Sequence, residues 1–259
     1  MGKSAQITAS CGIGDIVSFF AKIPSFKKTH QIDYLHIHLS GGWIEIPKLI
    51  IELSQPVIKS GLISSISLEE MKVDYKESWI PDDSTLKYQF SIPFSIPTFP
   101  SDDIKIPFNK ICAINPVTAS GNFEGFTPGR YLSKEVWIEI CKFMQQNGYR
   151  IVYLGGEKDC GYIPLDYIDL DLCGVTTIRE CISVLNKSDF FIGCNSWMWE
   201  CCAYRGIPTV CSYLTNYDIF CKIHVPSMER PSHGIPNLRI STNQSTEEIL
   251  KYMEELYER

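Results

Sequence analysis

The sequence predicts an α/β protein with two Rossmann-like domains that face a cleft. Two observations lead to this fold class. Short apolar strands alternate with helix-length segments in both halves of the 259-residue chain, as in parallel sheets covered by helices. The strands end at glycines or short polar turns, and capping residues open the helices that follow. We expect an N-terminal domain at 1–105, which includes a proline-rich connector, and a C-terminal domain at 106–259, which ends in a helix.

The first domain is expected to be short. Its predicted elements, in chain order, are a strand at 5–10, a helix at 15–26, a strand at 34–39, a helix at 46–59 and a strand at 63–68. Residues 76–108 then contain five prolines, and proline lacks the N–H that a central strand needs. We interpret 76–108 as the loop-rich end of this domain and the connector to the next one.

The second domain carries stronger local signals. Its predicted strands are 111–114, 150–154, 189–193 and 208–212, and its predicted helices are 133–148, 177–186, 196–205 and a terminal helix from 245. Ser133 is an expected N-cap. Thr177 and Ser245 each precede a glutamate by three residues, which makes a capping box. Gly148 and Gly206 follow two of these helices, where glycine commonly ends a helix.

The composition excludes several functional classes. The net charge of −6 argues against a nucleic-acid-binding surface, and no apolar stretch has the length of a membrane span. The N-terminus lacks the apolar core of a secretion signal, and Gln6 stands where a myristoylation signal has Ser or Thr. The eleven cysteines include no Cys-x-x-Cys pair, so we expect reduced, buried thiols and a cytoplasmic protein.

Other side chains that bind metals do not form a recognisable site. His36 and His38 alternate on a strand and therefore share one face, but no third ligand is evident beside them. Asp166, Asp169 and Asp171 lack the spacing of an EF-hand loop, and no glycine follows at the required place. The sequence therefore predicts no metal site.

The most informative stretch is residues 189–211, where an apolar strand, a polar turn and a helix follow one another. The strand ends near Gly193, and the turn holds Asn195 and Ser196. A helix start has N–H groups without intrahelical partners and a partial positive charge. At the carboxyl end of a buried strand, such a start suits a phosphate group. The alternative is that Asn195 or Ser196 simply caps the helix.

Three motifs together resemble the ADP-heptose:lipopolysaccharide heptosyltransferases, which form glycosyltransferase family nine. The first is Gly12-Ile-Gly-Asp15, followed by an apolar helix and Lys22-Ile-Pro24. The second runs from Ile114-Asn-Pro116 to Trp137 and on to the strand that ends at Gly155-Gly156. The third runs from Cys173 through Asn195-Ser196 to Gly206-Ile-Pro208. The resemblance extends over roughly 110–215 and is weak over the first hundred residues.

This resemblance implies the glycosyltransferase-B architecture with a shortened first domain. A nucleotide-sugar donor would bind the second domain, and a hydroxyl acceptor, such as a glycan, would bind mostly the first. Such enzymes generally need no metal and no cofactor besides the donor. The implied reaction is an inverting, metal-independent transfer of a hexose or heptose from a nucleoside diphosphate to the acceptor hydroxyl.

Asp15 is the candidate catalytic residue under this resemblance. Inverting transfer needs a carboxylate that takes the proton of the acceptor hydroxyl as the anomeric carbon is attacked. Gly12 and Gly14 would let the backbone pass close to a ligand. The residues alone leave a second interpretation open, in which Asp15 is the N-cap of its helix.

The resemblance also implies a set of donor-binding residues. Arg130 would face the diphosphate, because a guanidinium binds phosphate oxygens through two hydrogen bonds. Asn195 and Ser196 would hold the leaving group as its charge grows, and Glu157 would accept hydrogen bonds from hydroxyls. The complete predicted donor-binding set is Gly14, Thr118, Arg130, Gly155, Gly156, Glu157, Asn195, Ser196, Met198 and Glu200.

The chain departs from one family pattern, Asp-[Ser/Thr]-Gly-x-x-His. Asn195, Trp197 and Glu200 stand where that pattern has its acidic residue, glycine and histidine. Two alternatives therefore stay open beside the transferase: a nucleotide- or nucleotide-sugar-binding protein without catalytic activity, and a sugar-nucleotide epimerase of the same architecture. The sequence identifies neither the sugar nor the nucleotide base.

Overall fold

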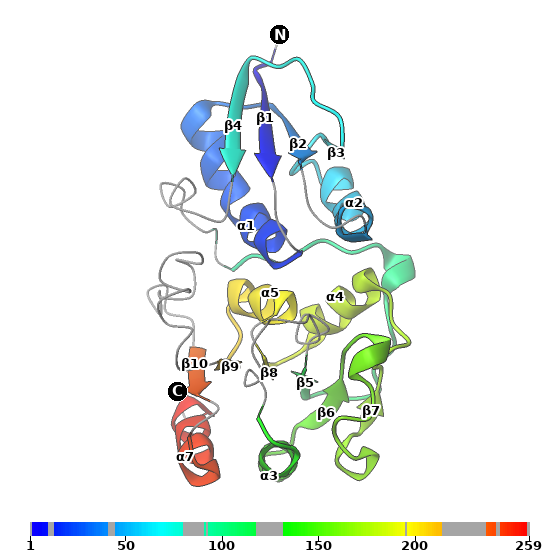
Figure 1. Ribbon diagram of the computed structural model, residues 1–259, viewed down its shortest axis with the longest axis vertical. Coiled ribbons are helices and arrows are strands. Elements are labelled where there is room, and N and C mark those ends of the chain that lie inside the picture. The colour runs from blue at the N-terminus through cyan, green and yellow to red at the C-terminus, as the bar shows by residue number, and fades with distance from the viewer. Residues whose placement is uncertain are drawn as a thin grey trace.

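Two parallel sheets, stacked along the long axis of the molecule with helices between them, form the structure (Figure 1). It is a computed structural model that describes residues 2–9, 13–40, 45–79, 91, 93–117, 132–194, 196–213, 237–241 and 244–257. The arrangement confirms the predicted α/β class with two Rossmann-like units. The expected division at residues 105 and 106 remains a prediction.

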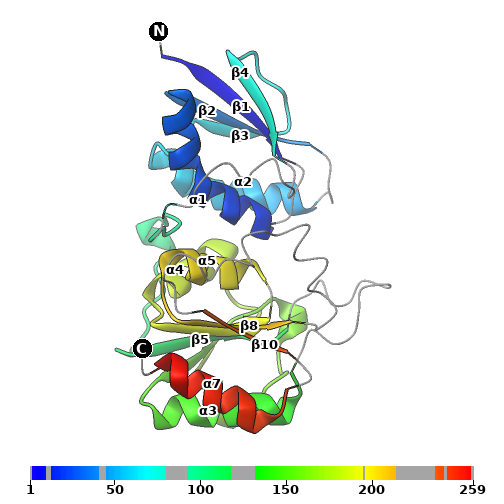
Figure 2. The same ribbon diagram turned by 90° about the vertical axis from the view of Figure 1, so that its left-hand side faces the viewer.

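The first sheet is parallel throughout and has the strand order β3-β2-β1-β4. Its strands are β1 (Ser4–Ala9), β2 (Tyr34–Leu39), β3 (Ser65–Ser67) and β4 (Tyr75–Trp79), and its helices are α1 (Ile13–His30) and α2 (Glu45–Lys59). Both helices lie on the side of the sheet that is turned towards the second unit (Figures 1 and 2). Helix α1 continues beyond its expected end at residue 26, with Pro24 inside it.

Strand β4 corrects the prediction that 76–108 is only a loop-rich connector. It pairs in parallel with β1, from Ala5 opposite Tyr75 to Ala9 opposite Trp79. All five prolines of 76–108 lie after Trp79, so every residue of β4 has a backbone N–H that can pair with β1. A strand at the edge of a sheet also needs a partner on one side only. The prolines therefore affect the connector and not the strand.

The second sheet has the order β10-β9-β8-β5-β6-β7. This is the Rossmann arrangement, in which strands are added outwards on both sides of a central pair, here β5 and β8. The strands are β5 (Ile111–Asn115), β6 (Arg150–Tyr153), β7 (Leu170–Asp171), β8 (Phe190–Cys194), β9 (Thr209–Tyr213) and β10 (Asn237–Ser241). The edge strands β7 and β10 are not predicted from the sequence.

Helices cover both faces of the second sheet (Figure 2). They are α3 (Lys134–Gln146), α4 (Ile178–Lys187), α5 (Trp197–Arg205) and α7 (Thr246–Tyr257). Helices α4 and α5 lie on the face nearer the first unit, and α3 and α7 lie on the far face. The two faces of a parallel sheet are usually buried in this way.

Local capping chemistry sets the helix ends that the sequence predicts. The Ser133 hydroxyl accepts a hydrogen bond from the Val136 N–H at 3.4 Å. At the start of α4, the Thr177 N–H donates to Glu180 Oε2 at 2.7 Å, and the Glu180 N–H donates to Thr177 Oγ1 at 3.3 Å. Gly206 ends α5 in a left-handed conformation with a φ of 84°, which glycine adopts without strain.

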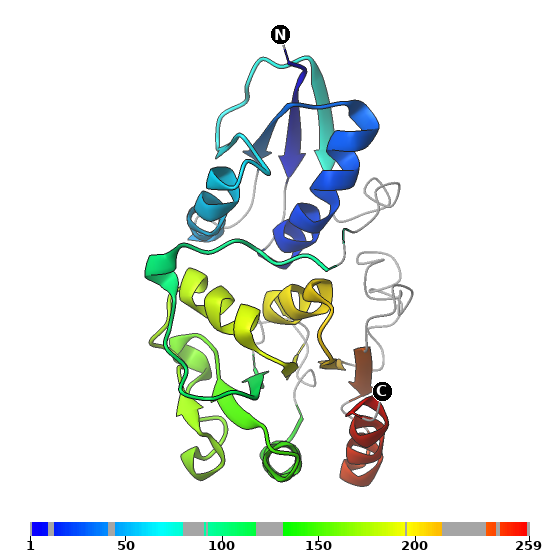
Figure 3. The same ribbon diagram turned by 180° about the vertical axis from the view of Figure 1, so that it is seen from behind.

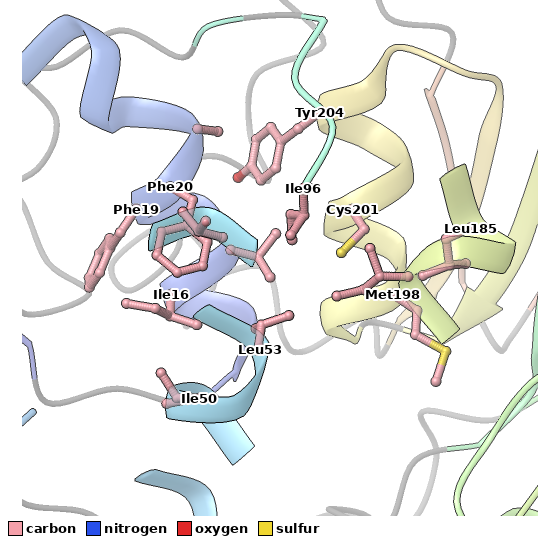
Figure 4. Close-up of a cluster of buried hydrophobic side chains, with 14 of the residues drawn as sticks. Ile16, Phe19, Phe20, Ile50, Leu53, Ile96, Leu185, Met198, Cys201 and Tyr204 are labelled. Atoms are coloured by element: carbon pink, nitrogen blue, oxygen red, sulfur yellow. The ribbon is translucent and has the colours of Figure 1, made fainter. Parts of the chain in front are cut away.

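One hydrophobic cluster joins the two units. It contains buried side chains from α1 and α2 of the first unit and from α4 and α5 of the second. Figure 4 shows members of this cluster at the junction: Ile16, Phe20, Leu53, Ile96, Leu185, Met198 and Cys201. Since these side chains are almost fully buried, the two units share apolar core rather than only touching at their surfaces.

The connector is bound to both units. It runs across the junction past α5 and α4 before it enters β5 (Figure 3). The Ser91 N–H donates to the Ala21 carbonyl of α1 at 2.8 Å, and the Phe94 N–H donates to the Tyr204 carbonyl of α5 at 2.8 Å. Further along, the Asn186 side-chain amide of α4 donates to the Ile96 carbonyl at 2.9 Å. These bonds fix the chain between the units.

Candidate functional site

The carboxyl ends of β5 and β8 mark the topological switch point of the second sheet. The two strands are parallel neighbours, but β5 leads to α3 on the far face and β8 leads to α5 on the near face. Ligands of open α/β sheets bind in the crevice that such a divergence leaves. Ser196 lies at this point as the N-cap residue of α5. It is one of the predicted phosphate contacts.

Asn115 connects three elements at the switch point. Its side-chain amide donates to the Leu154 carbonyl at the end of β6 and to the Val117 carbonyl, both at 3.0 Å. Its Oδ1 atom accepts the Ser196 hydroxyl at 3.2 Å. Both amide protons and the carbonyl of this buried side chain are thus in use, which fixes its orientation. The sequence motif Ile-Asn-Pro contains Asn115, but no local pattern assigns it this role.

The Ser196 hydroxyl does not cap α5. It occupies the N-cap position with extended backbone and makes no side-chain hydrogen bond to the first turn of the helix; it donates its proton to Asn115 Oδ1 instead. The interpretation of Ser196 as a side-chain cap is therefore wrong. The N–H groups at the start of a nine-residue helix carry partial positive charge and suit an anion.

The turn after β6 is closely packed against its own residues and against Cys173, which follows β7. A methyl group added at Gly155 would lie 2.9 Å from both Asp159 Cβ and Cys173 Sγ. The Gly156 N–H donates to Asp159 Oδ2 at 2.8 Å, although burial raises the pKa of that carboxyl overall. Glycine at 155 is thus explained by close packing against Asp159 of the same turn and Cys173, which follows β7. Gly156 and Glu157 are exposed beside it, and their donor-binding roles remain predictions.

Gly14 brings the first unit to the start of α5. A methyl group added there would lie 3.0 Å from Glu200 Oε1 and 3.7 Å from Trp197 Cα. At Gly14 it is therefore helix α5 that approaches the backbone closely. Contact between Gly14 and a donor remains a prediction. The structure places Gly14 against Glu200, which lies one turn of α5 after Ser196.

Glu200 is buried, with 5% of its surface exposed. Its Oε2 atom accepts the Ser18 hydroxyl of α1 at 2.8 Å, and the Ser18 oxygen lies 2.6 Å from the Tyr204 hydroxyl. Met198 is also buried, in the apolar cluster at the junction (Figure 4). The contacts that the structure describes for both residues point into the junction between the units, and their predicted donor-binding roles remain untested.

The structure thus brings Gly14, Ser196 and Glu200 together, and Asn115 links them to the strand end that precedes Gly155. Thr118, Arg130 and Asn195 lie outside the described residues, as does the side chain of Asp15. Asn115, Ser18 and Tyr204 belong to the same region but escape sequence reasoning, since each acts through a partner far away in the chain.

Two features are absent from the part of the chain that the structure describes. No group of three or more His, Cys, Asp or Glu side chains comes together there in a way that could hold a metal ion. Within the same residues, no helix is both long and apolar enough to span a membrane.

The chain is similar to known proteins in structure, whereas no similarity is found in sequence. No protein-family model matches the chain, and no curated protein matches it significantly. The glycosyl transferase family 9 structure from Veillonella parvula DSM 2008 is 12% identical, with a TM-score of 0.63, over 98% of this chain and 91% of that one. E. coli ADP-heptose LPS heptosyltransferase II is 9% identical, with a TM-score of 0.65, over 98% of both chains.

A third solved structure is similar over nearly its whole length. E. coli heptosyltransferase WaaC with ADP-2-deoxy-2-fluoro heptose is 11% identical, with a TM-score of 0.56, over 97% of this chain and 99% of that one. At such low identity, the likeness establishes the architecture. The chain has the two-unit α/β fold of the family 9 glycosyltransferase and heptosyltransferase structures, as the sequence motifs predict.

Proposed function

We propose that this chain is a glycosyltransferase that moves a sugar from a nucleoside diphosphate to a hydroxyl group of a glycan or another small acceptor. One observation carries the proposal: the first turn of α1, which contains Asp15, packs against the start of α5, where Ser196 stands. The fold that the chain shares with a structure containing an ADP-heptose analogue supports it.

The diphosphate of the donor would bind at the start of α5. The helix N-terminus offers backbone N–H groups, and the Ser196 hydroxyl, which donates to Asn115 without ligand, would turn to donate to a phosphate oxygen. As the sugar leaves, negative charge builds up on the phosphate oxygen, and donors fixed in advance stabilise that charge. Arg130 would add a guanidinium as the counter-charge.

Asp15 would act as the base. The acceptor oxygen attacks the anomeric carbon and forms the new bond, while the bond from that carbon to the phosphate oxygen breaks. The proton of the acceptor hydroxyl passes to the Asp15 carboxylate, and the bonding electrons leave with the nucleoside diphosphate. Attack from the side opposite the leaving group inverts the configuration at the anomeric carbon.

The proposal includes three further properties. The transfer needs no metal, because helix N–H groups and Arg130 would balance the diphosphate charge, and it needs no cofactor besides the donor. The protein works in the cytoplasm, a location supported by the nine described cysteines, which are all free thiols and would be expected to remain reduced there.

The first test is a thermal-shift screen with ADP-, GDP-, UDP-, CMP- and dTDP-linked sugars. A donor at about 100 times its Kd stabilises the folded state by about 2.7 kcal/mol, which raises the melting temperature visibly. The donor found in this way is then incubated with candidate hydroxyl acceptors, and release of the nucleoside diphosphate is measured. Release that depends on an acceptor supports the transferase.

Two substitutions test whether Asp15 acts as the base. Asp15→Asn should abolish transfer and keep donor binding, whereas Asp166→Asn, the same change at an exposed position, should leave both intact. Donor binding without acceptor-dependent release in the unaltered protein would instead favour a binding protein, an alternative motivated by the altered Asn195–Glu200 block. Isomerised sugar still attached to its nucleotide would favour an epimerase. No shift with any donor would contradict the proposal.

A further inference from the structure

A small polar cluster lies inside the apolar junction between α1 and α5. It consists of Ser18 of α1 and of Glu200 and Tyr204 of α5, and all three side chains are buried. Figure 4 shows the Tyr204 ring reaching from α5 towards α1. The other side chains labelled around it are mostly aliphatic or aromatic, so the hydrogen bonds of this cluster form in surroundings that exclude water.

The direction of the hydrogen bonds follows from proton count. Ser18 has one hydroxyl proton, which it donates to the Glu200 carboxylate at 2.8 Å, because a carboxylate can only accept. The 2.6 Å contact between the Ser18 and Tyr204 oxygens must then use the Tyr204 proton. Ser18 is thus held from both sides by two residues of α5 that lie one turn apart.

The second carboxylate oxygen of Glu200 meets the start of α1. Oε1 lies so close to Gly14 that a methyl group there would be 3.0 Å away. The N-terminal turn of a helix carries partial positive charge, which a carboxylate at this place stabilises. Glu200 therefore contacts α1 at two points, the turn that contains Gly14 and Asp15 and the next turn at Ser18.

The burial of Glu200 raises the question of why a carboxylate stands at this position. A carboxylate in apolar surroundings loses its hydration, and an apolar residue of similar size is often no less stable at such a position. The gain from a carboxylate is a defined geometry, since its hydrogen bonds form in only one alignment of the two helices. Ser196 lies one turn before Glu200 on the same helix, so this alignment sets the distance between the α1 turn and the predicted diphosphate seat.

We propose that Glu200 is a positioning residue: through Ser18 and the Gly14 turn, it fixes the part of α1 that carries Asp15 against the start of α5. This inference rests on the proposed function for its catalytic consequence. Its structural part, the fixing of the first turns of α1, is independent of that function.

The experiment compares two serine variants that lose the same kind of bond. Ser18→Ala removes the donor to Glu200, and Ser183→Ala removes a hydroxyl that donates to the Asp103 carboxylate at 3.0 Å. Both serines are buried, but Ser183 belongs to α4 and binds the connector. Glu200→Gln and Glu200→Ala complete the set, and Glu200→Gln keeps the size and an acceptor for Ser18.

The first readout is amide hydrogen exchange of the peptide that covers 13–18, measured on the full chain without ligand. Ser18→Ala and Glu200→Ala should speed up exchange there, and Ser183→Ala should not. Equal exchange at 13–18 in the Ser18→Ala and Ser183→Ala variants would overturn the inference, whether or not the protein transfers sugar.

The second readout is steady-state kinetics with the donor identified by thermal shift. Ser18→Ala and Glu200→Ala should lower kcat about 100-fold, the loss that a misplacement of about 1 Å can cause. The donor Kd of Ser18→Ala should stay within about twofold, because Ser18 is not among the predicted donor contacts and the interaction lost acts on the chemical step. Glu200→Gln should recover part of kcat. A kcat in Ser18→Ala equal to that in Ser183→Ala would overturn the catalytic part.

The two readouts separate the inference from the proposed function. If the unaltered protein transfers no sugar while the exchange of 13–18 still depends on Ser18 and Glu200, the proposed function fails and the positioning of α1 stands. If transfer is observed and neither variant changes kcat or exchange beyond the control, the positioning role fails and the transferase stands.

Discussion

Leu53→Ala tests whether the two units unfold as one. Leu53 of α2 is fully buried in the cluster that α1, α2, α4 and α5 share. Removal of a fully buried leucine side chain costs about 3 kcal/mol, as the transfer and cavity contributions add. With a urea m-value of about 3 kcal/mol/M, the high end of the range for small proteins, the midpoint of unfolding should fall by about 1 M.

The assay reports on the far side of the second unit. Cys141 of α3 is fully buried in the other cluster, with α7 and the far face of the second sheet. A thiol reagent labels it only after unfolding, and mass spectrometry identifies the labelled peptide at each urea concentration. If the shared cluster couples the units, Leu53→Ala should shift the Cys141 midpoint as much as it shifts the midpoint seen by circular dichroism.

Leu49→Ala is the matched control on the same helix, one turn earlier. Leu49 is 39% exposed, so its truncation should change the free energy of unfolding by less than about 0.5 kcal/mol. An unchanged Cys141 midpoint in Leu53→Ala, together with a two-step circular dichroism curve, would refute the reasoning, because the second unit would then unfold independently.

Three further predictions concern the second unit. Gly155→Ala should destabilise the fold by about 1–3 kcal/mol, because the new methyl group collides with Asp159 and Cys173. Gly156→Ala, whose methyl group would lie 3.5 Å from its nearest neighbour, should cost much less. Equal urea midpoints for the two variants would contradict this. Cys160 is the exposed residue among the nine described free cysteines, so it should react with a thiol reagent faster than the other eight in the native protein, as peptide mapping can check. The Thr177 N–H lowers the pKa of the Glu180 carboxyl below 4.5, so this charge stabilises the fold above the unfolded pKa and the benefit is lost as the pH falls through the lowered value. Glu180→Gln should therefore melt earlier than the unaltered protein at pH 7, and a difference that persists at acidic pH below that value would exclude this cause.

The helix starts were predictable because their chemistry is local. A capping box needs only two residues three positions apart, and Thr177 with Glu180 forms the expected reciprocal bonds. Strand β2 was predictable because apolar residues alternate with His36 and His38 along it, and its bounds agree with the prediction. The edge strands β4, β7 and β10 were missed because short strands of this kind depend on a partner strand elsewhere in the chain.

The site was predictable in position but not in its contacts. Ser196 was identified from the strand, turn and helix around it, and the structure places it at the switch point. Its hydrogen-bond partner, Asn115, lies 81 residues earlier, and no local pattern could pair them. The same holds for Gly14, whose sequence context fits a ligand but whose neighbour in the fold is α5.

The polar cluster and the apolar cluster at the junction have different physical roles. Aliphatic side chains such as Leu53 and Met198 bring α1, α2 and α5 together, but hydrophobic attraction has no preferred direction. A shift of α5 along α1 by one turn, about 5.4 Å, would still bury apolar surface. It would, however, break the hydrogen bond between Ser18 and Glu200, and breaking a buried hydrogen bond is unfavourable. The apolar residues therefore account for the association of the two units, and the bonds among Ser18, Glu200 and Tyr204 account for its register.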